Sequence, residues 1–103
     1  MALPEKEGEA AFRLLADFHK RIQAATLVIR TRGLRGNTQL AELYKWCGLS
    51  ASSVEFWKKQ YDAALTLTAQ DQAEARLMKE VLILQSYMGR IEAIIRSEDV
   101  AQF

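Results

Sequence analysis

Residue types that often carry chemistry are scarce in this chain. Its 103 residues include one cysteine, Cys47, one histidine, His19, and one proline, Pro4. A lone cysteine cannot form a disulfide within one chain, and one cysteine with one histidine is too few for a structural zinc site. We therefore expect no metal and no other cofactor.

Long apolar runs are also missing. No stretch approaches the roughly 18 consecutive apolar residues that a membrane-spanning helix needs. Residues 1–7 do not combine a basic segment with an apolar one, as a secretory signal would. We expect a cytoplasmic protein that forms a single domain over residues 1–103 and has no membrane partner.

Charge is nearly balanced overall but unevenly distributed. The formal net charge is +1. Residues 20–59 hold eight basic residues against two acids, whereas residues 1–19 and 60–103 are both net acidic. The middle of the chain could therefore present a basic face to an acidic partner, or simply carry scattered solvated charges.

Few residues in this sequence interrupt helices, and the pattern predicts an all-α fold. Pro4 suits a first helical turn, and the segment 32–37, with Gly33 and Gly36, predicts a loop. Thr38 is expected to cap a short helix that Gly48 closes. The four predicted helices are long, short, medium and long, and cover about 5–31, 38–47, 51–66 and 69–97.

The start of the third helix has two candidate caps. Ser50 could cap it directly, or Ser52 could form a capping box with Glu55. Thr68 is expected to begin the last helix, with Asp71 three residues on. The first helix should bury a stripe of apolar residues at alternating spacings of four and three: Ala11, Leu15, Phe18, Ile22, Ala25 and Ile29.

The last helix is apolar over more than one face. A second line, Ile83, Tyr87 and Ile94, lies beside its main stripe. A small monomer can rarely cover so wide an apolar surface, so the pattern predicts a symmetric homodimer packed through this helix. The alternative is a central core helix in a monomer. The predicted dimer interface is Leu77, Val81, Leu84, Tyr87, Met88, Ile91 and Ile95.

Candidate catalytic groups are few. His19 is flanked by apolar Leu15 and Ile22 in the first helix, which favours a structural role over a general base. Cys47 lies on the apolar side of its helix, where cysteine usually behaves as a small hydrophobe. No phosphate-binding, dinucleotide-binding or metalloprotease motif occurs. We expect a protein that is not an enzyme.

The segment from Leu40 to Lys59 resembles the helix-turn-helix of bacterial DNA-binding regulators. Gly48 matches the glycine of the tight turn, and Leu49 and Ser50 match the apolar residue and the serine after it. The positions that lock the two helices together fall on Leu43, Cys47, Val54 and Trp57. The more common explanation of such a match is a plain corner between packed helices.

Two features depart from that family's pattern. Tyr44 occupies a position that is normally alanine or glycine, and the positions facing a major groove carry no Arg, Asn or Gln. DNA binding is therefore the alternative hypothesis, in the form of a dimeric helix-turn-helix repressor. The residues assigned to it are Ser50, Ser52, Ser53, Lys58 and Lys59.

Two aromatic residues predict a protein-binding surface. Phe56 lies off the predicted buried stripe, with Lys59 on its own side, and Trp46 is similar on the preceding helix. Exposed aromatics beside basic residues are typical interface anchors, although both could instead cover a helix junction or a dimer seam. The predicted protein-binding residues are Phe56, Trp46, Arg32, Arg35 and Lys59.

In its length and its long-short-medium-long helix plan, the whole chain resembles the QslA-like family of small helical quorum-sensing anti-activators. The resemblance spans the chain and involves no diagnostic motif, so it assigns no site residue. It implies that a dimer of this protein binds a LasR-type transcription regulator, competes with the regulator's own dimerisation and prevents DNA binding. The leading hypothesis is thus an inhibitory protein-binding regulator.

Overall fold

The computed structural model describes residues 7–101, with side chains described over 9–97. This part of the chain is all-helical, as predicted, and contains no strand. It comprises α1 (Glu7–Thr31), the short 3-10 turn η1 (Leu34–Gly36), α2 (Thr38–Ala63) and α3 (Leu67–Ala101). The predicted helix start at Pro4 lies outside the described residues.

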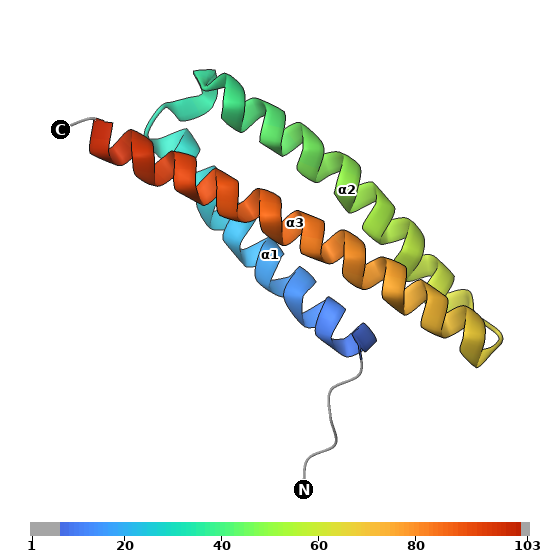
Figure 1. Ribbon diagram of the computed structural model, residues 1–103. Coiled ribbons are helices and arrows are strands. Elements are labelled where there is room, and N and C mark those ends of the chain that lie inside the picture. The colour runs from blue at the N-terminus through green and yellow to red at the C-terminus, as the bar shows by residue number, and fades with distance from the viewer. Residues whose placement is uncertain (1–6, 102–103) are drawn as a thin grey trace, which may run out of the picture.

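The helices form an elongated, flat layer with α3 in the middle (Figure 1). Both α1 and α2 pack along α3, whereas the backbones of α1 and α2 stay apart from each other. The radius of gyration is 16.4 Å, against about 13 Å for a compact domain of this size. Much of each helix surface therefore faces outward.

The prediction of four helices is wrong, because the second and third predicted helices form one. Helix α2 runs unbroken through Gly48, and Gly33 is the one glycine within residues 7–101 that has a positive φ, at 69°. A glycine in a helix interior costs only about 1 kcal/mol, which the burial of Cys47 and Val54 on either side of it outweighs.

The capping residues also differ from the prediction. Asn37, not Thr38, caps α2, and its side chain accepts a hydrogen bond from the Leu40 amide at 3.0 Å. Neither Ser50 nor Ser52 starts a helix, because α2 is continuous there, and the Ser52 hydroxyl donates to the Gly48 carbonyl inside α2. At the start of α3 the Thr66 hydroxyl, rather than that of Thr68, accepts from the Ala69 amide at 3.1 Å.

The predicted apolar stripe of α1 lies in the core. The residues predicted to form a dimer interface are also covered, but by helices of the same chain. Of these residues, Leu77, Val81, Leu84, Met88 and Ile91 are all 0% exposed within one chain. Ile95 is buried as well, and Tyr87 is half-buried. The last helix is apolar on two sides because α1 covers one side and α2 covers the other. This arrangement matches the alternative prediction of a central core helix.

A polar cluster joins α1 to α3 at the edge of the core. The Arg21 guanidinium donates from Nε to a Glu92 oxygen at 3.1 Å and forms a second bond with the other Glu92 oxygen. It also donates to Gln85, whose amide nitrogen donates to the Leu14 carbonyl at 2.7 Å. These bonds fix the register of α1 along α3.

Replacing Gly48 with Ala should raise the free energy of unfolding by about 1 kcal/mol, because alanine favours a helix interior and nothing lies within 4 Å of an added Cβ. Urea denaturation measures the change. Gly89→Ala in α3 is the matched control, with equally open space. If Gly48 formed a left-handed turn, Gly48→Ala would destabilise the protein while Gly89→Ala would still stabilise it.

The Arg21–Glu92 pair makes stability depend on pH. Hydrogen bonding to Arg21 holds the pKa of Glu92 below its ordinary value. The stabilisation is therefore present above the unfolded carboxyl pKa of about 4.3 and is lost as the pH falls through the lowered folded pKa.

Glu92→Gln should lower the free energy of unfolding by about 0.5–1 kcal/mol at pH 7, and the difference from the parent protein should shrink at pH 3. Urea denaturation at both pH values measures it. Glu42→Gln, at an exposed position, serves as the control. A loss from Glu92→Gln that is equally large at pH 3 would contradict the assignment.

Candidate functional site

One face of α2 carries a row of exposed apolar side chains. Trp46, Leu49 and Phe56 are 46%, 53% and 54% exposed. Because α2 is continuous, residues three and seven positions apart point in similar directions, and these three lie within an arc of about 80° over about 15 Å of helix. We call Trp46, Leu49 and Phe56 the α2 stripe.

The aromatic ring of Phe56 has a packed neighbour beneath it. It meets the half-buried Trp57 ring edge-on, with the two ring centroids 5.0 Å apart. Trp57 also packs against the core, and the Arg76 guanidinium lies 5.7 Å from its ring centroid. Phe56 is therefore supported in one orientation while half of its surface faces solvent.

A groove between α2 and α3 continues the stripe at Trp46. Its volume is about 630 Å³. Glu42 and Arg90 supply one charge of each sign at its lining. The apolar part of the lining comes from both helices: Leu43, Trp46, Tyr87, Ala93 and Ile94. Trp46 belongs to both features, so stripe and groove make one partly apolar surface, which is the candidate partner-binding site.

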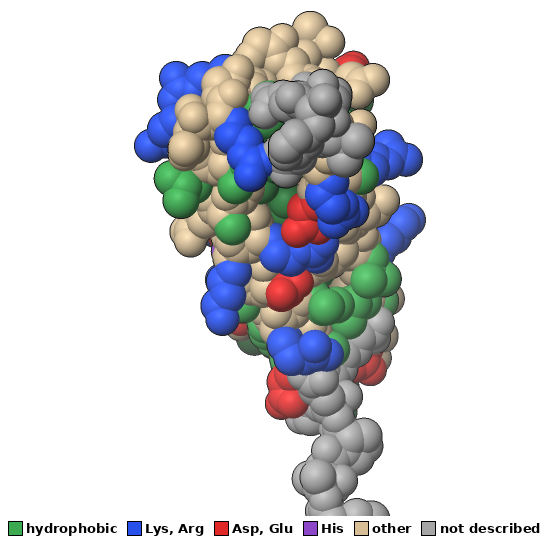
Figure 2. Space-filling view, turned by 90° about the vertical axis from the view of Figure 1, so that its left-hand side faces the viewer, with side chains coloured by type: hydrophobic (Ala, Val, Ile, Leu, Met, Phe, Trp, Pro, Cys, Tyr) green, Lys and Arg blue, Asp and Glu red, His purple; other side chains and the backbone are tan. Residues whose placement is uncertain are grey.

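The structure brings together only part of the predicted protein-binding set. Trp46 and Phe56 share the stripe, with Lys59 exposed on the same helix. Arg35 instead lines a separate pocket on the opposite side of α2, and Arg32 lies just after α1. Figure 2 shows Lys and Arg side chains spread over the face at the left-hand side of Figure 1, among acidic and hydrophobic side chains.

The residues assigned to DNA binding do not share one surface. Lys58 is half-buried and turns toward α1, where its ammonium lies 5.9 Å from the Phe12 ring centroid. Ser50 and Ser53 are half-buried, whereas Ser52 and Lys59 are exposed. In one continuous helix these five positions are spread around the axis.

The two candidate reactive groups are placed as expected for structural residues. Cys47 is a buried core residue, and burial raises the pKa of its thiol, which disfavours the nucleophilic thiolate. His19 is exposed and lies against the Phe18 ring edge. In the described part of the chain, no group of three or more His, Cys, Asp or Glu side chains could hold a metal ion.

Sequence reasoning missed the pocket between α1 and α2. It is lined on the α1 side by Thr26 and Arg30 and on the α2 side by Tyr44. Arg30 is visible in the sequence as part of a basic cluster, and Tyr44 as an unusually large residue. Nothing in the sequence shows that the two converge, because 14 positions and a turn separate them.

Among residues 7–101 no helix is long and apolar enough to cross a membrane. Comparisons of the chain with protein-family models, with curated proteins and with solved structures find no match.

Proposed function

We propose that this chain is a small regulatory protein that binds a transcription regulator and inhibits it by direct contact. The observation that supports this function is the α2 stripe together with the α2–α3 groove. Solvent-exposed Trp and Phe side chains are characteristic anchors of protein interfaces, and Phe56 is in addition held by the Trp57 ring.

The shape of this surface suits an amphipathic helix of the partner. The stripe offers anchors about 10 residues apart along α2, and the groove beside it has apolar walls from two helices. Glu42 and Arg90 at the groove would set the orientation of a partner helix by their opposite charges.

The class of partner comes from the resemblance in length to quorum-sensing anti-activators, since the four-helix plan that also carried this resemblance is replaced by three helices within residues 7–101. In that mechanism the inhibitor covers the surface through which a LasR-type regulator pairs with itself. Because the regulator must pair to bind DNA, occupancy of this surface would release it from its operator. The binding energy of the stripe and groove would have to exceed that of the regulator's own contact.

A homodimer remains part of the proposal, with a changed interface. Since the predicted interface residues are covered within one chain and the α2 stripe is assigned to the regulator, a second copy would have to use other exposed surface. Sedimentation velocity at micromolar concentration tests this. A dimer that Phe56→Ala leaves intact would agree with this assignment, whereas a dimer that Phe56→Ala dissociates would show that the stripe pairs two copies instead of holding the regulator. A monomer would remove the homodimer from the proposal.

Phe56→Ala should weaken capture of the regulator by about 30-fold or more, as truncation of an interface hot spot does. The fold should persist, because half of the ring is already exposed. Leu82→Ala is the matched control: Leu82 is 53% exposed, like Leu49, but lies on the outer face of α3. The measurement is release of a purified LasR-type regulator from operator DNA in a gel shift.

The same gel shift separates the two function classes. Release of the regulator by the parent protein and by Leu82→Ala, but not by Phe56→Ala, supports the anti-activator. A salt-resistant shift of operator-sized DNA by this protein alone, abolished when Lys58 and Lys59 become Glu, would instead establish the DNA-binding repressor. If Phe56→Ala released the regulator as well as the parent protein does, the α2 stripe would not be the binding surface.

A further inference from the structure

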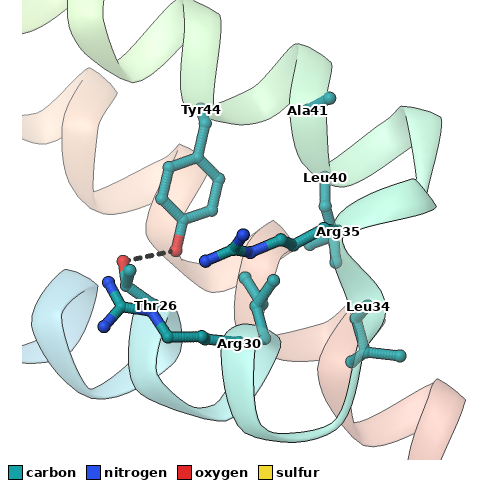
Figure 3. Close-up of a pocket in the computed structure, with 8 residues that line it drawn as sticks. Thr26, Arg30, Leu34, Arg35, Leu40, Ala41 and Tyr44 are labelled. Carbon is teal, nitrogen blue, oxygen red and sulfur yellow. Dashed lines mark hydrogen bonds between the residues drawn. The ribbon is translucent and has the colours of Figure 1, made fainter.

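A second hollow lies on the other side of α2, where α1 ends and α2 begins. Figure 3 shows side chains from α1, η1 and α2 meeting around it. Its volume is about 220 Å³. Ile29, Leu34 and Leu40 form an apolar floor and are 8%, 8% and 2% exposed.

The chain builds this pocket through a tight connection between the two helices. Gly33 adopts a left-handed conformation, with a φ of 69°, and directs Leu34 into the core. Asn37 then starts α2 by accepting a hydrogen bond from the Leu40 amide. The two helices diverge from this corner without backbone contact, which leaves space between their side chains.

A hydrogen bond between hydroxyl groups spans the pocket. The Thr26 hydroxyl donates to the Ile22 carbonyl at 2.7 Å. Its oxygen, 3.0 Å from the Tyr44 hydroxyl, therefore acts as the acceptor, and Tyr44 is the donor. With its proton committed, the Tyr44 oxygen offers only lone pairs to the pocket, so a bound anion would have to be held by other groups.

Two guanidinium groups supply that positive charge. The side chains of Arg30 and Arg35 extend toward the space beside Tyr44 and Thr26 (Figure 3). Among the residues whose side chains the structure describes, no carboxylate lines the pocket and none forms an ion pair with either arginine. By contrast, Arg21 is neutralised by Glu92 and Asp17. Within residues 9–97, no acidic side chain compensates the charge at the pocket.

We propose that this pocket binds a small carboxylic acid whose apolar body fills the space over Ile29, Leu34 and Leu40. Arg30 and Arg35 would hold the carboxylate, for which the guanidinium fork is suited. A cavity of about 150 Å³ accommodates benzene, so the present volume admits one ring and a carboxylate. Inorganic phosphate would meet the arginines but leave the apolar floor exposed to water.

Phenylacetate is the probe that tests the proposal, titrated into the full chain and followed by amide chemical shifts in two-dimensional NMR. The expected result is saturable binding, with shifts centred on residues 26–44. Phenylacetamide has the same ring but no charge and should bind at least about tenfold more weakly, since a charge-assisted hydrogen bond is lost.

Arg30→Gln and Arg35→Gln should each weaken phenylacetate binding by about tenfold or more. Arg96→Gln, which changes an exposed arginine of α3 that does not line the pocket, is the matched control and should leave it unchanged. Because all three arginines are exposed, none of these variants should unfold the chain, and the NMR spectrum confirms that each is folded.

Three results would overturn the proposal. They are no saturable shift with phenylacetate at millimolar concentration, equal binding of phenylacetate and phenylacetamide, and equal or tighter binding of inorganic phosphate. None of these depends on the α2 stripe, so failure of this site leaves the proposed capture of a regulator untouched, and failure of that capture leaves this site intact.

Discussion

The structure depends on the burial of α3 along two of its sides. A row of its side chains, from Leu77 to Ile91, is excluded from water only because α1 covers one flank and α2 the other. Each apolar side chain buried in this way contributes about 1.5–3 kcal/mol. Neither outer helix could be removed without exposing part of the same core.

This arrangement determines which side of α2 remains exposed. One side of α2 packs against α3 through Cys47 and Val54, and a second side faces α1 through Tyr44. The remaining arc carries Trp46, Leu49 and Phe56, residues whose exposure serves no packing purpose within the chain. Exposed apolar surface that the fold does not need is the usual mark of an interaction site.

Sequence patterns correctly predicted the all-helical class, the buried α1 stripe and the exposure of Trp46 and Phe56, because each depends on local spacing. They failed at Gly48, where the glycine predicted a turn but the packing of α2 on α3 stabilises a continuous helix. They also failed to distinguish a core covered by a second copy from one covered by α1 and α2, since both demand the same apolar residues. The pocket beside Tyr44 depends on the angle between two helices, which no local pattern encodes.

The connections between the helices carry a consequence for how the molecule assembles. Helices α2 and α3 are joined by three residues, so many of their contacts close short loops. Contacts of α1 with α3 are distant in sequence, as between Arg21 and Glu92, 71 positions apart, and closing such loops costs more entropy. The α2–α3 hairpin should therefore form first and α1 dock last. By the same reasoning α1 is the unit that opens most readily, and amide exchange should be faster there than in the centre of α3.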